Sequence, residues 1–238
     1  MTGLFPSCAL VILAVVVFSL LLLLVALAIY PGELSWLPGK GNQWLYDRAA
    51  ANYSQKWQRH SYAQYEKQIQ QAATAVAKNV SQPRVLDIAC GSGRATRAAA
   101  ATLGKNAGYT AIDSSSAMLQ EMANTLAGII APAAIKSENC DAVEWLERNS
   151  GEFDLLLLME AAEFIPQNRQ LIAGLAKAAA NGSRLVMTRP ASLWWIFFPR
   201  RGQSRRALSK RLSAEGFGDI QFTPWRNRYE LVSAVRLT

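Results

Sequence analysis

The sequence predicts an α/β fold with a mostly parallel sheet, preceded by one transmembrane helix. Three observations predict it. Short apolar runs such as Val85–Ile88 and Phe153–Met159 are typical of parallel strands that are buried on both faces. Stretches rich in alanine and charged residues alternate with these runs, as the helices of βαβ units do. A long uncharged segment, Ala9–Tyr30, precedes all of them.

The N-terminal segment is predicted to be a retained membrane anchor. As a helix, Ala9–Tyr30 is long enough to cross a hydrocarbon core of about 30 Å. A cleaved signal peptide is the alternative, but no Lys or Arg precedes the apolar run. The first basic residues, Lys40 and Arg48, follow the segment, so the positive-inside rule places the main domain in the cytoplasm. The predicted localisation is a single-pass membrane protein with a cytoplasmic domain.

The length of 238 residues allows one domain with an appendage. We predict an anchor and linker over residues 1–35, a helical cap over residues 36–80 and an α/β domain over residues 81–238. The net charge of +8 favours anionic surfaces, and the anchor favours lipid among them. With three scattered cysteines and one histidine, neither a disulfide framework nor a metal centre is expected.

The elements are predicted in order along the chain. Sparse glycine and many Ala, Gln and charged residues predict two helices, residues 44–60 and 61–79. Strands are predicted at residues 85–88, 109–112, 133–136, 153–159 and 184–188. The helices between them are predicted at residues 94–103, 117–127, 143–149 and 168–180. Two further strands are predicted from alternating polar and apolar residues at 218–223 and 230–236.

The segment after the first strand points to a cofactor site. Val85–Ile88 is followed by Gly91 and Gly93, and a helix begins near Arg94. A strand, a tight glycine turn and a helix N-terminus leave free backbone N–H groups beside a cleft, where a cofactor can approach the main chain. Asp113 ends the second strand, where a carboxylate can accept hydrogen bonds from ribose hydroxyls.

Two kinds of nucleotide cofactor compete for this site. The dinucleotide fingerprint G-x-G-x-x-G/A fits poorly, because Thr96 stands at its third glycine when the count begins at Gly91. Asp87 places a negative charge where a diphosphate would be repelled, and the same charge suits a cofactor with a cationic amino acid portion. The segment resembles the first motif of class I S-adenosylmethionine-dependent methyltransferases, with Ala89 at the usual first glycine.

The resemblance covers residues 44–238 and implies a Rossmann-like sheet of seven strands with helices on both faces, closed by an antiparallel pair. It implies S-adenosylmethionine as the cofactor. Ser114 and Met118 would then lie beside the ribose and adenine, and Asp141 would accept the adenine amino group. The predicted cofactor-binding residues are Tyr53, Asp87, Ala89, Gly91, Gly93, Asp113, Ser114, Met118, Asp141, Ala142 and Met159.

Two of these residues have purely structural alternatives. The segment Tyr46–Tyr53 is similar to the family segment that closes over the cofactor, where an aromatic face would attract the sulfonium. However, Tyr53 and Trp57 are spaced so that they can also pack one helix face onto the core. Asp141 can instead cap the helix that follows it.

Two carboxylates follow the fourth strand, at the edge where open α/β sheets bind ligands. Glu160 and Glu163 are the predicted catalytic residues, since either can act as a general base toward an acceptor. Glu160 can alternatively bind the amino group of the cofactor, and Glu163 can be a solvated helix start. No Asp/Asn-Pro-Pro-Tyr signature of nucleic-acid amino-methylation follows the strand.

The predicted function is a membrane-anchored methyltransferase for a small lipophilic acceptor, such as a quinone precursor, a lipid or a hydrophobic thiol. The expected partners are the lipid bilayer and that acceptor; nucleic acid and metal are not expected. An RNA or protein methyltransferase and a non-catalytic assembly partner are the alternatives. The aromatic and basic segment Pro190–Arg211 is predicted to make a second membrane contact, with a buried lid as its alternative.

Overall fold

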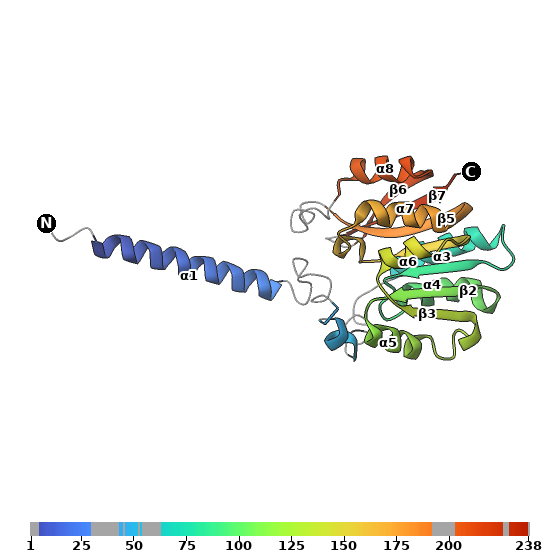
Figure 1. Ribbon diagram of the computed structural model, residues 1–238, viewed down its shortest axis with the longest axis horizontal. Coiled ribbons are helices and arrows are strands. Elements are labelled where there is room, and N and C mark those ends of the chain that lie inside the picture. Colours follow the sequence, from blue (N-terminus) through green and yellow to red (C-terminus); the bar gives the residue numbers. More distant parts are fainter. Residues whose placement is uncertain are drawn as a thin grey trace. The chain divides into compact units, whose positions relative to one another are not determined.

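The computed structural model describes residues 5–29, 43–44, 46–51, 53, 63–191, 203–225 and 229–237. The chain divides into two compact units, Met1–Leu37 and Pro38–Thr238. The first unit contains the helix α1, Phe5–Ile29, which has no charged residue. The second contains the sheet and the remaining labelled helices (Figure 1).

No helix in the described ranges is both long and apolar enough to cross a membrane. This finding contradicts the predicted transmembrane helix and the predicted single-pass membrane localisation with a cytoplasmic domain, and both are corrected.

The second unit is built on a seven-stranded sheet with the order β3-β2-β1-β4-β5-β7-β6. Strands β1 to β5 are parallel to one another, whereas β7 is antiparallel to both β5 and β6. The sheet is therefore mixed, and the expected Rossmann-like sheet with an antiparallel pair at its end is confirmed. The strands are β1 (Arg84–Ile88), β2 (Gly108–Asp113), β3 (Ile135–Asn139), β4 (Phe153–Leu158), β5 (Ala179–Pro190), β6 (Phe217–Trp225) and β7 (Tyr229–Arg236).

Helices cover both faces of the sheet. They are α3 (Ala63–Ala77), α4 (Arg94–Leu103), α5 (Ser116–Leu126), α6 (Ala142–Arg148), α7 (Asn168–Ala178) and α8 (Arg205–Ala214). Helices α3 to α5 share one core with Leu155 and Leu157 of β4. Helices α6 to α8 share the other core with Leu156 and Leu158. Because side chains alternate across a strand, the continuous apolar run of β4 fills both cores.

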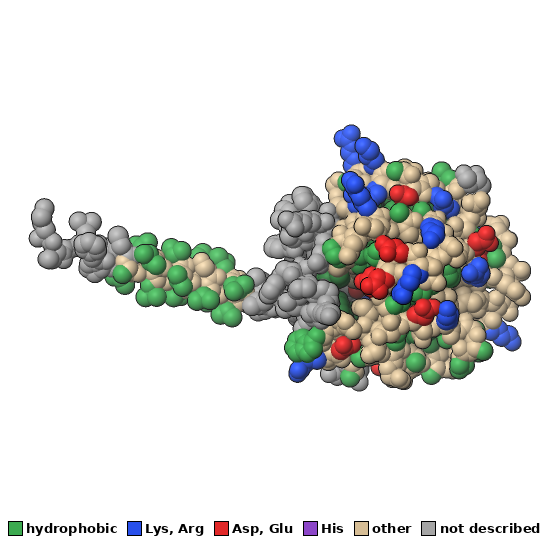
Figure 2. Space-filling model, viewed as in Figure 1, with side chains coloured by type: hydrophobic (Ala, Val, Ile, Leu, Met, Phe, Trp, Pro, Cys, Tyr) green, Lys and Arg blue, Asp and Glu red, His purple; other side chains and the backbone are tan. Residues whose placement is uncertain are grey.

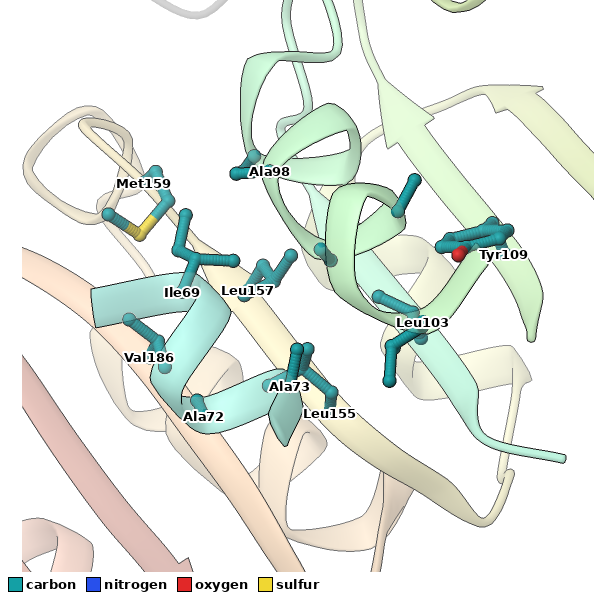
Figure 3. Close-up of a cluster of buried hydrophobic side chains, with 14 of the residues drawn as sticks. Ile69, Ala72, Ala73, Ala98, Leu103, Tyr109, Leu155, Leu157, Met159 and Val186 are labelled. Atoms are coloured by element: carbon teal, nitrogen blue, oxygen red, sulfur yellow. The ribbon is translucent and has the colours of Figure 1, made fainter. Parts of the chain in front are cut away.

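The core between α3, α4 and the sheet is packed with small side chains. Ala72 and Ala73 of α3 lie near Leu155 of β4 (Figure 3). The buried side of α4 consists mainly of alanines, Ala95, Ala98, Ala99 and Ala100. Small side chains let a helix approach its neighbours closely at native packing density. The alanine-rich sequence thus holds the N-terminus of α4 at the carboxyl end of β1.

Some predicted elements differ from the observed ones. β3 begins two residues later than predicted, because this edge strand alternates weakly and most of its residues are exposed or half-buried. β5 begins at Ala179, well before the predicted residue 184. Much of the predicted helix over residues 44–60 and of the segment Pro190–Arg211 lies outside the described residues. In the described part of that segment, Lys and Arg side chains gather over α8 (Figure 2).

Candidate active site

A cavity of about 280 Å³ lies at the carboxyl edge of the parallel strands. Its lining residues follow β1, β2, β3 and β4, where the strand order reverses beside β1. Open α/β sheets bind ligands at such a switch point. The predicted site residues that line it are Tyr53, Asp87, Ala89, Gly91, Asp113, Ser114, Met118, Asp141, Ala142, Met159 and Glu160.

The turn after β1 has three residues in the left-handed region, with φ of 52° at Ala89, 53° at Gly91 and 77° at Gly93. Glycine adopts this conformation freely, whereas alanine there costs about 1–2 kcal/mol. Gly93 is the N-cap of α4 and is not among the lining residues. A Cβ on Gly93 would lie 2.5 Å from Cγ of Met122, so this glycine serves the contact between α4 and α5.

Asp113 is fixed by the glycine turn itself. Its Oδ2 accepts the Gly91 N–H at 2.8 Å, and its Oδ1 accepts the Ser115 N–H at 2.9 Å. The N–H of Gly91 is therefore engaged by Asp113. The carboxylate of Asp113 is half-buried and needs such donors, and desolvation still raises its pKa. Each carboxylate oxygen retains a second lone pair for a ligand hydroxyl.

Asp87 is held by the residue that disrupts the dinucleotide fingerprint. Its Oδ2 accepts both the backbone N–H of Thr96, at 3.0 Å, and the Thr96 hydroxyl, at 2.6 Å. The Asp87 carboxyl lines the cavity and is 1% exposed. Burial raises the pKa of Asp87 to about 7, although the two bonds from Thr96 oppose the rise. The side chain therefore changes charge near neutral pH.

Asp141 both caps α6 and lines the cavity. Its Oδ1 accepts the N–H groups of Val143, at 2.8 Å, and Glu144, at 3.1 Å, as the N-cap of α6. The residue also lines the cavity. A cap occupies one oxygen of a carboxylate, so capping and ligand binding are compatible.

Glu160 faces a cation that the sequence analysis missed. Its carboxylate lies 3.4 Å from Nη2 of Arg94, and both residues line the cavity. The Arg94 guanidinium lies 5.6 Å from the ring centroid of Tyr53 and 5.9 Å from that of Tyr65, within cation–π range. Arg94 opens α4, where the helix dipole disfavours a cation. That unfavourable position was the available signal for its role.

Glu163 lies away from the cavity lining. It is 1% exposed, and its Oε1 accepts the hydroxyl of Tyr229 at 2.7 Å. It belongs to the short 3₁₀ helix η3, Ala162–Phe164, so the interpretation as a solvated helix start is wrong. The carboxylate joins η3 to β7.

Aromatic rings form one wall of the cavity. Tyr46 makes edge contacts with Tyr53 and Phe164, with ring centroids 6.2 Å and 6.5 Å apart. All three line the cavity. Next to Tyr46, Asp47 accepts the Ser115 hydroxyl at 2.6 Å, which joins this segment to the start of α5. Tyr53 thus faces the cavity, while Trp57 lies outside the described residues.

The lining matches the chemistry of S-adenosylmethionine. Ser92 lines the cavity and is 1% exposed, and its Oγ has no hydrogen-bond partner among the described residues. Such a buried hydroxyl calls for a ligand or a water. The carboxylates suit hydroxyl, amino and cationic groups, and Arg94 suits a carboxylate. In the described ranges no cluster of three potential metal ligands occurs, and the predicted absence of a metal stays a prediction.

Comparison with known proteins identifies the domain. A methyltransferase domain model matches residues 85–182, and no curated protein matches the chain. The N-methyltransferase NodS of Bradyrhizobium japonicum WM9, solved with S-adenosylhomocysteine, is 16% identical, with 80% of this chain and 96% of NodS covered and a TM-score of 0.63. The magnesium protoporphyrin IX methyltransferase ChlM of Synechocystis PCC 6803, solved with S-adenosylmethionine, is 17% identical, with 81% and 95% covered and a TM-score of 0.58.

The fold also occurs in a protein named for other chemistry. The [4+2]-cyclase SpnF is 16% identical, with 71% of this chain and 81% of SpnF covered and a TM-score of 0.56. Several other similar chains are longer, and this chain covers between 51% and 60% of them. At these identities the solved structures establish the fold, and the domain match carries the activity. Residues 85–182 match a methyltransferase domain, which supports an enzyme of the S-adenosylmethionine-dependent methyltransferase type.

Proposed function

We propose that the protein transfers the methyl group of S-adenosylmethionine to a small lipophilic acceptor. The observation that carries this proposal is the division of the cavity into two chemically different parts. Asp87, Asp113 and Asp141 lie on the polar side, and Tyr46 and Phe164 form the aromatic wall. The polar side suits the cofactor, and the aromatic wall suits an apolar acceptor.

Asp113, Asp141 and Glu160 have distinct proposed roles toward the cofactor. Asp113 accepts the ribose hydroxyls with the lone pairs that Gly91 and Ser115 leave available. Asp141 accepts the adenine amino group. Glu160 binds the α-ammonium group and Arg94 the α-carboxylate, because the two fixed charges complement a zwitterion. Of the two predicted catalytic carboxylates, Glu160 is the one in the lining.

When bound, the cofactor supplies a sulfonium methyl group: the acceptor–methyl bond forms as the methyl–sulfur bond breaks. The donor is already activated, so the residues contribute mainly by alignment and by excluding water. The ring of Tyr53 offers a π face to positive charge, as it does to Arg94. A base is needed only for an acceptor that keeps its proton until attack. Glu160 is the lining carboxylate nearest in sequence to Phe164, the aromatic residue of η3.

Calorimetric titration of the purified protein with S-adenosylmethionine tests the cofactor. Ala in place of Asp113 is expected to weaken binding by about 1–3 kcal/mol, the scale of hydrogen bonds to a charged group. Asp154→Ala is the matched control. Asp154 also accepts a backbone N–H, that of Arg84, but it lies at the amino ends of β1 and β4, opposite to the cavity. Absence of binding to the unmodified protein, or equal losses in the two variants, would contradict the proposal.

The affinity for S-adenosylmethionine is expected to rise with pH across neutrality. The pKa of Asp87 is about 7 in the ligand-free protein, and a cationic ligand favours the ionised carboxylate. Below this pKa, each unit of pH is therefore expected to strengthen binding by up to about tenfold, with a plateau above it.

Because the folded-state pKa of Asp87 lies above the ordinary 3.8, the ligand-free protein loses stability as the pH rises between these values.

The matched variant for this pH dependence is Asp87→Asn. It keeps the size of the side chain and removes the titration, so its affinity is expected to be lower and nearly flat over the same range. A profile that is unchanged in Asp87→Asn would assign the titration to another group.

The acceptor class is tested with methyl-labelled S-adenosylmethionine. The protein is incubated with the labelled cofactor and a cell extract that has been divided into organic-soluble, protein and nucleic-acid fractions. We expect the label in small organic-soluble products. Label confined to RNA or protein would favour the alternative acceptors.

A further inference from the structure

Thr188 places a hydroxyl group within the buried end of β5. The residue is 0% exposed, and it follows the apolar residues Leu185, Val186 and Met187. Its backbone pairs with Leu231 of β7, and the residue is not among those that line the cavity. Burying a hydroxyl at this position is unfavourable unless it makes a hydrogen bond.

The partner of the Thr188 hydroxyl is the backbone of Glu160. The Glu160 N–H donates to Oγ1 of Thr188 at 2.6 Å. Glu160 has a φ of 53°, in the left-handed region that non-glycine residues rarely adopt. Such a conformation persists where surrounding contacts fix it, and it is common at functional sites. The hydrogen bond that Glu160 donates to Thr188 is one such contact.

The backbone conformation of Glu160 determines where its carboxylate lies. At this φ the side chain stands 3.4 Å from Arg94 and lines the cavity. Three residues farther along the chain, Glu163 instead lies against Tyr229, away from the lining. A change of φ at Glu160 to the ordinary region would turn its side chain away from Arg94.

We propose that Thr188 is a positioning residue, which fixes Glu160 in the left-handed conformation so that Glu160 and Arg94 together bind the amino acid end of S-adenosylmethionine. This inference rests on the proposed function of the cavity. Thr188 does not touch the cofactor, and its contribution to affinity passes through Glu160.

The test compares four proteins with the unmodified one by calorimetric titration with S-adenosylmethionine: Thr188→Val, Thr188→Ser, Glu160→Ala, and Thr188→Val combined with Glu160→Ala. Val has the shape of Thr without the hydroxyl. Thr188→Val is therefore expected to weaken binding about tenfold, the effect of losing one hydrogen bond between Glu160 and the cofactor. Ser keeps the hydroxyl, so Thr188→Ser is expected to retain the affinity. On the Glu160→Ala background, Thr188→Val is expected to have no further effect.

Three results would overturn the inference. Equal losses in Thr188→Val and Thr188→Ser would assign the effect to packing. A full loss from Thr188→Val on the Glu160→Ala background would show that Thr188 does not act through Glu160. Unchanged affinity in Thr188→Val would show that the hydroxyl has no role. If Thr188→Val does not fold, which circular dichroism reports, Thr188→Ala takes its place against Thr188→Ser.

The proposed function and this inference can fail separately. Absence of binding to the unmodified protein contradicts the proposed function. Binding to the unmodified protein with no difference between Thr188→Val and Thr188→Ser contradicts only the role of Thr188. Amide hydrogen exchange at Glu160 gives a readout without ligand, and we expect faster exchange in Thr188→Val than in Thr188→Ser.

Discussion

Val in place of Gly93 is expected to lower the free energy of unfolding by roughly 2–5 kcal/mol, from overpacking and a left-handed backbone together. A Cβ at Gly93 would lie 2.5 Å from Cγ of Met122, and Leu126 is also within contact distance. Met122 and Leu126 are buried in the core that α4 and α5 share. These side chains have little room to move, so the added methyl groups separate the two helices.

Gly91 gives the matched variant, because it lies in the same turn and has the same sign of φ. A Cβ on Gly91 would meet nothing within 4 Å, although Gly91 lines the cavity. Gly91→Val therefore bears only the cost of the left-handed backbone, about 1–2 kcal/mol. Its side chain would occupy space at the cavity lining, so we expect a folded protein that no longer binds S-adenosylmethionine.

Chemical denaturation and calorimetric titration separate the two effects. Gly93→Val is expected to shift the denaturation midpoint strongly, whereas Gly91→Val is expected to shift it little and to remove the binding heat. Retained affinity in folded Gly91→Val would contradict the proposed cofactor site. A stable Gly93→Val protein would contradict the packing role of that glycine.

The sequence predicts the parallel part of the fold because burial on both faces leaves a strong signal. β1 and β4 are continuous apolar runs, and their side chains enter two cores. β3 is an edge strand whose residues are mostly exposed or half-buried, so its limits were shifted. The N-terminal apolar run predicted a membrane span. The structure contradicts this prediction, because no helix in the described ranges is long and apolar enough to cross a membrane.

The site was predicted where local motifs carry the chemistry and was missed where distant contacts do. Asp87 and Asp113 lie at the carboxyl ends of strands and could be found from the motif alone. Arg94 was missed, because its contacts with Glu160 and Tyr65 come from other parts of the chain. Glu160 and Glu163 look equivalent in sequence, but the left-handed backbone at Glu160 gives them different surroundings. No local pattern predicts that turn, since Thr188 that contacts it lies in the next strand.

Ala in place of Glu230 is expected to destabilise the protein by about 3–5 kcal/mol, because it leaves a buried cation without its partner. Glu230 is paired with Arg189, and the two side chains are 9% and 8% exposed. The carboxylate also accepts from Nε of Arg205 at 3.0 Å. It thereby connects the end of β5, the start of β7 and the first turn of α8. Loss of the carboxylate removes this connection and leaves the guanidinium of Arg189 without its carboxylate partner.

The pH dependence of this effect follows from the pKa of Glu230. The hydrogen bond from Arg205, with the nearby charges of Arg189 and Arg205, lowers the pKa below the ordinary 4.5. A lowered pKa gives stability that is present above 4.5 and is lost as the pH falls through the folded-state value. Urea denaturation should therefore show a large difference in the free energy of unfolding between the unmodified protein and Glu230→Ala at neutral pH, and a smaller difference in acid.

Arg205→Ala is the control, because Arg205 is 55% exposed and its loss leaves the buried pair of Glu230 and Arg189 intact. An Arg205→Ala protein as unstable as Glu230→Ala, or a difference that persists unchanged in acid, would contradict the assignment to the buried pair.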